Sequence, residues 1–235
     1  MAVKIYNAGL NNIRIRENQV FTTPELVADA GKYIESAGGY YAGGNILVDG
    51  KEYAIIIAPK ELGEYNGTLQ WKTSQTTTSG ATSTYNGKAN MDAIIAVGLS
   101  DHPAAQYCAN LDINGFNDWH LPAPDELEIC YRFLKPTTDD NYTNTRPLHD
   151  AVNGTNPNSS PEGSSYTTSE PSQTSVSDFV EGGSQAFDVL THPWYWSSME
   201  YTPATSWMQS FRYGSQYYNN KPYSHRTRAV RWLEV

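Results

Sequence analysis

The sequence predicts an α+β fold in which short strands and irregular loops outweigh the helices. Hydrophobic residues make up only 39% and charged residues only 17% of the chain, and Ser, Thr, Asn, Gly and Tyr fill the difference. This mixture favours strands and turns over long helices. Prolines at helix-start positions nevertheless indicate helices near residues 24 and 124. A polar stretch over about 137–185 shows little regular periodicity and is expected to be a long loop excursion.

The first 45 residues are predicted to be an N-terminal arm with a short helix, serving as an attachment segment. Residues 1–23 alternate loosely and are expected to be extended. A helix is predicted over 24–36, because Thr23 suits the N-cap and Pro24 the first helical position. The segment has too little apolar content to form its own core. We therefore expect it to pack on the main domain or on a partner.

The main domain is predicted to span 46–235 and to begin with a β-hairpin. Asp49 and Gly50 lie between two apolar runs and form a strong hairpin-turn signal. Pro124 suits the start of a helix with a wide apolar face. Residues 72–87 are expected to be loop. Further helices are expected at 88–97, 102–111 and 124–134, and short strands at 194–198, 206–212, 216–219 and 227–233.

Charge, apolar runs and cysteine content argue against several classes of protein, including nucleic-acid-binding, secreted and membrane-inserted proteins. The net charge is −9, and no Lys/Arg cluster is present to neutralise phosphates, so nucleic-acid binding is not expected. Arg226, Arg228 and Arg231 alternate with apolar residues and are interpreted as structural ion pairs. No secretory signal or membrane-length apolar run is visible, which predicts synthesis in a cytoplasm without membrane insertion. Cys108 and Cys130 are expected to be unpaired and buried, with a disulfide as the open alternative.

No catalytic or metal-binding motif is found in the sequence. The five histidines lack an HxxxH spacing, and CxxC, GxSxG, P-loop and DxDxDG motifs are absent. Neighbouring acids at 125–126 and 139–140 are explained by a helix start and by solvation. His120 is interpreted as a half-buried hydrogen-bonding residue. The sequence therefore predicts a non-enzymatic protein with no cofactor and no metal.

Two passages resemble one known family. The passage GFNDWHLPAPDEL is similar to a signature with the core DWRLP, and the passage from Tyr195 to Arg231 is similar to an ending that starts with YWSS. Together they are characteristic of the Lcl C-terminal domain family, also called DUF1566. The resemblance covers about 46–235. It implies a C-type-lectin-like fold with two helices, small antiparallel sheets and long irregular loops.

The resemblance also implies a function. The segments GKANMDAIIAVG and FLKPTTDDN resemble versions in bacteriophage tail-fibre and other virion proteins. The chain is then expected to be a virion structural protein, a tail fibre or capsid decoration, located in the virion. Its arm would bind other virion proteins, and its domain would perform receptor binding to a host-surface glycan or protein. A homo-oligomer is compatible with this arrangement.

Two alternatives stay open: an enzyme related to formylglycine-generating oxidases, and a bacterial adhesin. The enzymes of this fold need a reactive cysteine pair near the C-terminal end, whereas Cys130 lies well before Trp194. The sugar-binding loops of calcium lectins, EPN or QPD, are absent. The chain also departs from the family pattern, with His120 in place of Arg and Ala123 in place of a helix-capping Thr or Ser. The second change is expected to weaken the helix start by ~1 kcal/mol.

The C-terminal aromatics are predicted to divide into a core and a binding surface. Motif positions and period-two spacing assign to the core Trp119, Leu121, Trp196, Trp207, Phe211 and Val230. Residues between these positions are Tyr, Asn, Gln and His, a mixture typical of binding surfaces. The alternative is a half-buried sheet surface without a partner. The predicted binding residues are Tyr201, Tyr213, Gln216, Tyr217, Tyr218, Asn219, Asn220, Tyr223 and His225.

Overall fold

The predicted hairpin at Asp49 and Gly50 starts the main sheet. Both residues have positive φ, 51° and 74°, as a two-residue hairpin turn of this type requires. They join β4 (Gly39–Val48) to β5 (Lys51–Ile57). Strand β5 lies inside the sheet, and its residues 54–57 are at most 1% exposed. A strand covered on both faces needs such an unbroken apolar run.

The structure is a computed structural model and describes residues 13–16, 19–22, 30–143 and 155–235. The main sheet has the strand order β12-β5-β4-β3, and β7 pairs with β4. A second sheet has the order β10-β9-β8, and two small sheets pair β1 with β2 and β6 with β11. All these pairs are antiparallel. The remaining elements are β1 (Ile13–Arg16), β2 (Gln19–Thr22), β3 (Tyr33–Ile34), a 3-10 turn (Glu35–Ala37), α2 (Lys60–Gly63), β6 (Leu69–Gln70), α3 (Gly87–Gly98), a second 3-10 turn (Leu99–Asp101), α4 (Pro103–Ala109), α5 (Pro124–Leu134), β7 (Ser159–Ser160), β8 (Trp194–Thr202), β9 (Thr205–Ser210), β10 (Gln216–Asn220), β11 (Ser224–His225) and β12 (Val230–Glu234).

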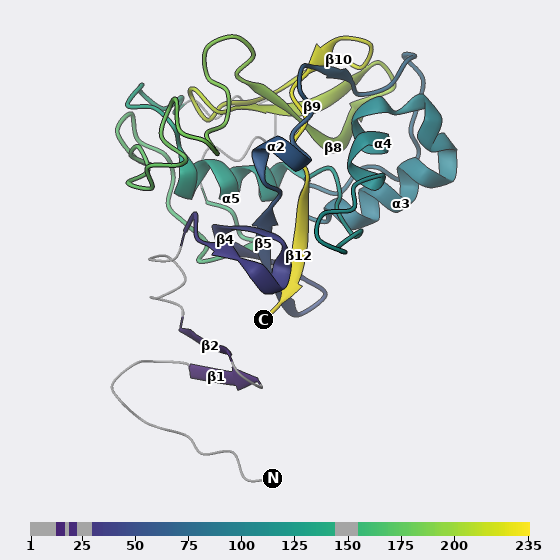
Figure 1. The fold of residues 1–235 in the computed structure, drawn as a ribbon. Helices are drawn as coiled ribbons and strands as arrows, with labels where there is room; N and C mark the ends of the chain where they lie inside the picture. Colours follow the sequence, from purple (N-terminus) through teal and green to yellow (C-terminus); the bar gives the residue numbers. More distant parts are fainter. Residues whose placement is uncertain (1–12, 17–18, 23–29, 144–154) are drawn as a thin grey trace.

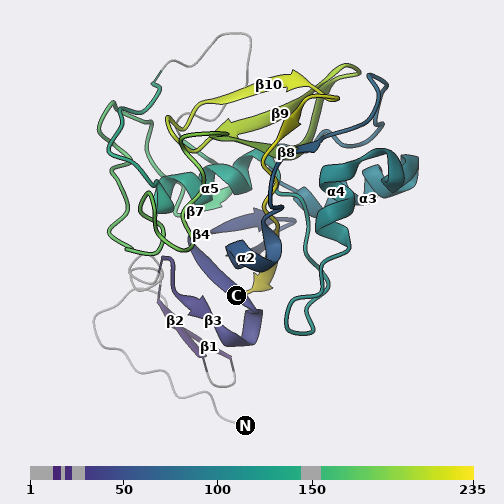
Figure 2. The same ribbon diagram turned by 45° about the horizontal axis from the view of Figure 1, so that its top comes forward.

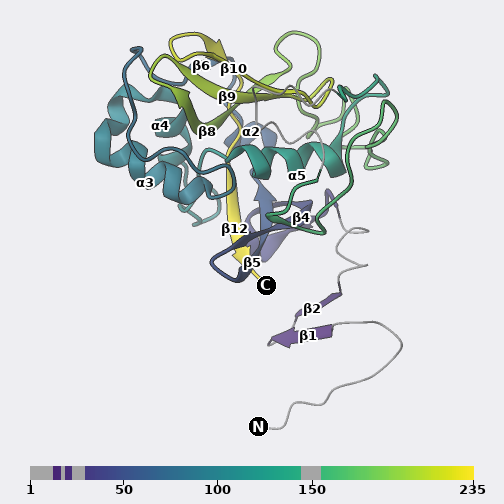
Figure 3. The ribbon, with the colours of Figure 1, turned by 180° about the vertical axis from the view of Figure 1, so that it is seen from behind.

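Helix α5 lies between the two larger sheets. Figures 1 and 3 show β8–β10 on one side of α5 and β4, β5 and β12 on the other. Figure 2 shows α3 and α4 together at one flank of the molecule. Close approach of α5 to β4 requires glycine, because a Cβ added at Gly43 would lie 2.6 Å from the Phe133 ring. The predicted α+β class is confirmed, and so are the segments near α3, α4, α5, β8, β9, β10 and β12, whereas β6 and β11 were not predicted.

The predicted core is confirmed. Trp119, Leu121, Trp196, Trp207, Phe211 and Val230 are all at most 5% exposed. Two apolar clusters divide the interior: Trp196 and Met208 belong to one, and Phe211 and Val230 to the other. In the second cluster Phe211 stacks on Phe187 with centroids 3.7 Å apart. Cys108 and Cys130 are unpaired and buried, as expected.

The N-terminal prediction needs a correction. Residues 30–36 were expected to continue a helix, but Tyr33 and Ile34 form strand β3 and pair with Tyr40 and Gly39. Sheet pairing to β4 overrides the local helical pattern. Residues 24–29 of the predicted helix lie outside the described residues. Leu148 and Val152, apolar residues of the polar excursion that could enter a core, also lie outside them. The predicted domain boundary at 45/46 falls inside β4, so the body of the domain includes residues before 46.

The start of α5 replaces its missing cap in two ways. Ala123 has no side-chain acceptor, but its own N–H donates to the Glu126 carboxylate at 2.6 Å. The N–H of Asp125 donates to the carbonyl oxygen of Thr84 at 2.9 Å. A carbonyl from a distant loop thus satisfies a donor that a Thr or Ser side chain would otherwise cap. The weakening expected from Ala123 is therefore offset.

The first turn of α5 also buries a carboxyl group that is poorly satisfied. Asp125 is 1% exposed, and Asn158 Nδ2 donates to its Oδ2 at 2.8 Å. Its Oδ1 is buried and has no hydrogen-bond partner among the described residues. Burial, helped by the nearby Glu128 and Glu126 carboxylates, raises the pKa of Asp125 to about 7.

Arg228 joins three separate segments in the interior. Its Nε donates to the carbonyl of Ala58 at 3.0 Å, and its Nη1 donates to the carbonyl of Gln185 at 2.7 Å. Its Nη1 lies 3.8 Å from the carboxylate of Glu64, and its guanidinium lies 4.8 Å from the Phe187 ring centroid. Arg226 and Arg231 also form ion pairs, with acids at 188 and 118. The structural interpretation of the three arginines is confirmed.

Removing Arg228 is expected to destabilise the fold strongly. Arg228→Ala removes one of the two guanidinium groups that pair with the buried Glu64 and leaves the carbonyls of Ala58 and Gln185 without their donor, at a cost of about 3 kcal/mol in the free energy of unfolding. Urea denaturation measures the change. Lys51→Ala is the matched control, since the Lys51–Glu234 pair is exposed and is worth at most about 1 kcal/mol. Equal losses in the two variants would contradict the role given to Arg228.

Asp125 is expected to make stability fall as the pH rises. Because burial raises the pKa of Asp125 in the folded state, its carboxyl group favours the folded protein at low pH. This contribution to the free energy of unfolding is fully present below about pH 4 and is lost as the pH rises through about 7. Asp125→Asn should therefore gain stability relative to the parent by about 2–4 kcal/mol between pH 4.5 and pH 8. Thermal unfolding across this range tests the difference. The exposed Asp92→Asn serves as control, and a parallel pair of pH curves for Asp125→Asn and the parent would refute the prediction.

Candidate functional site

The predicted binding residues centre on an aromatic cluster across the β8–β10 sheet. The rings of Tyr201 and Tyr218 stack with centroids 4.5 Å apart, and Tyr217 stacks on Tyr218 at 4.8 Å. Trp207 on the middle strand contacts Tyr201 edge-on at 5.2 Å and is 5% exposed. Trp207 thus supports a layer of tyrosines. We name Tyr201, Tyr217 and Tyr218 the tyrosine layer.

The geometry of the tyrosine layer limits how it can bind. Stacking turns ring faces toward one another, so a ligand meets mainly ring edges and hydroxyl groups. Tyr201 is 39% exposed, whereas Tyr217 and Tyr218 are partly buried. Tyr201 lies on β8 and Tyr217 and Tyr218 lie on β10, the two outer strands, so the layer spans the sheet across β9. Edges and hydroxyls suit polar or protein partners more than face-on stacking.

Three predicted residues lie near the layer but have other contacts. Asn219 Nδ2 lies 3.0 Å from His225 Nε2, and the His225 ring meets Trp196 edge-on at 4.7 Å. Burial, with a smaller effect of His192, lowers the pKa of His225 to about 4, so this ring is neutral at pH 7. Asn220 pairs with Thr205 at the end of the sheet.

The structure separates the other predicted residues from the layer. Tyr223 is 57% exposed in the turn before β11. Tyr213 is 40% exposed but lies in the connection between β9 and β10, where the guanidinium of Arg212 covers its ring at 5.1 Å. Gln216 is only 6% exposed, and its Nε2 donates to the carbonyl of Pro124 at 2.8 Å. Gln216 is therefore a structural residue, because its side chain ties the start of β10 to the first residue of α5.

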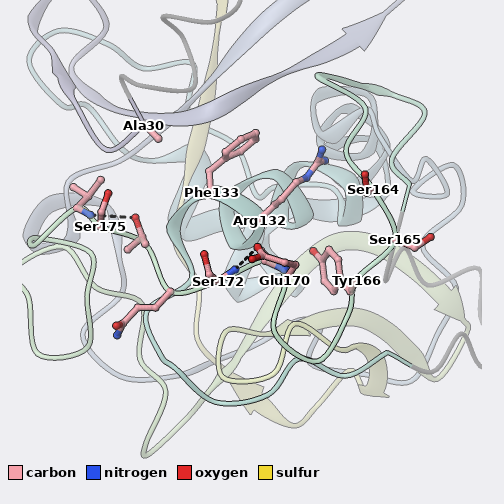
Figure 4. A pocket seen from close by; sticks show the side chains of 13 residues that line it. Ala30, Arg132, Phe133, Ser164, Ser165, Tyr166, Glu170, Ser172 and Ser175 are labelled. Carbon is pink, nitrogen blue, oxygen red and sulfur yellow. Dashed lines mark hydrogen bonds between the residues drawn. The ribbon is translucent and has the colours of Figure 1, made fainter.

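A cavity that the sequence did not predict lies at the C-terminal half of α5. Its volume is about 630 Å³, within the range of about 300–1,000 Å³ typical of ligand sites. Arg132 and Phe133 of α5 line it, together with residues 164–166 and 170–176 of the polar excursion. Figure 4 shows Ser164 and Ser165 on the side opposite Ser175, with Glu170 and Tyr166 between them. These loop positions have no periodicity, so the sequence gives no indication that they meet in space. Their high content of Ser and Thr is the only feature of the sequence that distinguishes them.

The motif residues DWHLP have structural roles. His120 is 2% exposed, so it is more deeply buried than expected, and its Nε2 lies 3.2 Å from the Glu126 carboxylate. The same carboxylate accepts a hydrogen bond from Trp232 Nε1 at 2.5 Å. Asp118 accepts from Arg231 at 2.6 Å. These hydrogen bonds between side chains stabilise the packing of α5 and the DWHLP segment against β12.

The described residues contain neither a metal-binding cluster nor a membrane-spanning helix. Over 30–143 and 155–235, His, Cys, Asp and Glu side chains form no group that could hold a metal ion. The helices of those residues are all too short or too polar to cross a bilayer.

Comparison with known protein families identifies the chain. The profile of the Lcl C-terminal domain family matches residues 64–231, which include the tyrosine layer and nearly the whole cavity. A search of curated proteins found no match for this chain. The matched segment covers well over half of the sequence and contains both motifs from which the resemblance was inferred. The chain belongs to the Lcl C-terminal domain family.

Proposed function

We propose that this chain is a non-enzymatic binding protein of a bacteriophage virion, a fibre or decoration protein whose domain is C-type-lectin-like. In this proposal the N-terminal arm attaches the chain to other virion proteins. The tyrosine layer across β8–β10 contacts a host-surface molecule or a neighbouring virion subunit. The resemblance of the GKANMDAIIAVG and FLKPTTDDN segments to virion proteins supports the location.

The tyrosine layer is the observation that carries the binding role. Tyr201 and Tyr218 reach toward each other from outer strands of one sheet, above Trp207 of the middle strand. A rigid sheet and mutual stacking hold the rings in place, which reduces the entropy lost on binding. Tyrosine is also enriched where few residues provide most of the binding energy.

The cysteines support a non-enzymatic role over the oxidase alternative. Cys108 and Cys130 have 0% exposed surface. Burial raises the pKa of both thiols far above the usual value. Reactive cysteines instead have lowered pKa values and access to solvent. The side chains available for a thiol mechanism are thus protonated and covered.

Truncating the tyrosine layer is expected to weaken binding. Tyr201→Ala combined with Tyr218→Ala should reduce adsorption of the purified chain to host cells or to virion proteins by about tenfold or more, as loss of a binding hot spot does. Tyr213→Ala is a matched control, because Tyr213 is 40% and Tyr201 39% exposed, and the two lie at opposite ends of the sheet. Equal adsorption by all variants would remove the layer from the binding role.

The virion location has its own test. Mass spectrometry of purified phage particles is expected to detect the chain in stoichiometric amounts. A chain that lacks residues 1–23 should be missing from the particles, while it still folds and binds like the parent. Particles without the full-length chain would refute the location. Incorporation of the shortened chain would refute only the role of the arm.

A further inference from the structure

Strand β12 forms one edge of the main sheet, and its backbone groups alternate between two directions. In an antiparallel ladder the N–H and C=O groups of every second residue point to the same side. The Ala229 carbonyl accepts the N–H of Ala58 at 3.0 Å, and the N–H of Val235 donates to the Glu52 carbonyl at 3.2 Å, so the odd-numbered residues bond toward β5. The even-numbered residues, 230, 232 and 234, therefore direct their backbone groups outward.

The outward backbone groups of β12 are used only at its first residue. Val230 exchanges two hydrogen bonds with His120, at 2.8 and 3.0 Å. Beyond that point, Trp232 and Glu234 form no outward backbone hydrogen bond with any residue that the structure describes. The opposite side of the sheet differs, because β4 pairs there with both β3 and β7. The end of β12 is thus an open edge, and such an edge is a template for pairing with another strand.

The β1–β2 hairpin is a strand pair without a sheet to join. Its two strands form a sheet by themselves, with Ile13 opposite Thr22 and Arg16 opposite Gln19. Figures 1 and 3 show this hairpin apart from the main sheet. An isolated two-stranded hairpin is at best marginally stable in water, and a further strand is a common way to stabilise it. The chain therefore contains both an open edge and a hairpin that lacks a neighbour.

The charges of the hairpin and of the open edge are complementary. Residues 1–23 contain three basic residues and one acid, a net charge of +2, which leaves −11 for the rest of the chain. Two of the basic residues, Arg14 and Arg16, belong to β1, whereas β2 contains no charged residue. At the open end of β12 the side chain of Glu234 is 49% exposed. Opposite charges on neighbouring strands attract, so β1 suits this edge better than β2 does.

The hairpin is tethered too closely to place β1 beside β12 of its own chain. The chain enters the main sheet at the β3 edge, where the N–H of Gly31 donates to the Tyr41 carbonyl at 2.8 Å, and β12 is the opposite edge. With β1 beside β12, β2 would lie five strand spacings from β3, about 24 Å. Because β5 is covered on both faces, a path over a covering layer about 10 Å thick adds about 20 Å. The segment from Thr22 to Ala30 spans at most about 29 Å.

We propose that β1 of a second copy of this chain adds to the open edge of β12, so that the hairpin of one copy extends the main sheet of the next. Backbone groups of Trp232 and Glu234 then bond to β1, and the positive charge of β1 lies beside the Glu234 carboxylate. The two surfaces differ, so the contact is head-to-tail and generates a ring or a filament. The inference rests on the attachment role proposed for the arm and names a copy of this chain as its partner.

The test begins with the mass of the purified full chain in solution, measured by light scattering. With a Kd of about 10 μM or tighter, the chain at about 100 μM is expected to be larger than one copy. Deletion of residues 1–23 should reduce it to a single copy. Glu234→Pro should do the same, because proline removes an outward N–H and is tolerated at a sheet edge. Glu234→Ala is the matched control: it keeps the N–H and should weaken association at most about fivefold.

Mixing the two single-copy variants gives the sharpest outcome. The chain without residues 1–23 keeps the open edge, and Glu234→Pro keeps the hairpin, so the mixture should form a complex of two copies and no larger species. In that complex, hydrogen exchange of the Trp232 N–H in the shortened chain should slow about tenfold or more, as a new backbone hydrogen bond requires.

Three results overturn the proposal. The first is a parent that remains a single copy at about 100 μM. The second is association that survives both the deletion and Glu234→Pro, since the interface then lies elsewhere. The third is a mixture that stays as single copies although circular dichroism shows both variants folded like the parent. Detection of the chain in phage particles is a separate measurement, so a failure of the virion location is distinguishable from a failure of this pairing.

Discussion

The buried guanidinium of Arg228 is the constraint on which the arrangement of this domain depends. A charge in the interior is tolerated only when its donors are paired. Arg228 finds acceptors on the end of β5, on the polar excursion and near Glu64, three segments far apart in sequence. The excursion, which has little periodicity, is held in place because Gln185 provides two of these acceptors. An otherwise loose segment is thereby tied to the main sheet.

Helix α5 connects this anchored interior to both candidate surfaces. Its first residue accepts the hydrogen bond from Gln216 that fixes β10. Its last turns carry Arg132 and Phe133 at the cavity. Its acids face inward and bind Trp232, Arg132 and Tyr166. The family motif that begins at Asp118 is therefore a scaffold, and the segments outside it supply the exposed surfaces.

Much of the fold could be predicted because its signals are local. The Asp49-Gly50 turn, the proline at 124 and the period-two spacing of Trp207 and Phe211 each act within a few residues. Strand β3 could not be predicted in this way, since its residues depend on pairing with β4. Burial of Gln216 depends on α5, and replacement of the cap at Ala123 depends on the Thr84 carbonyl. The cavity arises from loop segments that only the folded chain brings together.

The way the cavity wall is held has a consequence for its evolution. Asn141 and Lys135 bind the wall through the carbonyl oxygens of Thr167, Thr168 and Pro171. Every residue type has a carbonyl oxygen, so side chains at most wall positions can change without loosening these bonds. The lining at 164, 165, 172 and 175 is thus free to diversify by point substitution while the backbone keeps its course. Single substitutions at these positions therefore change the chemistry of the cavity lining and leave the fold intact.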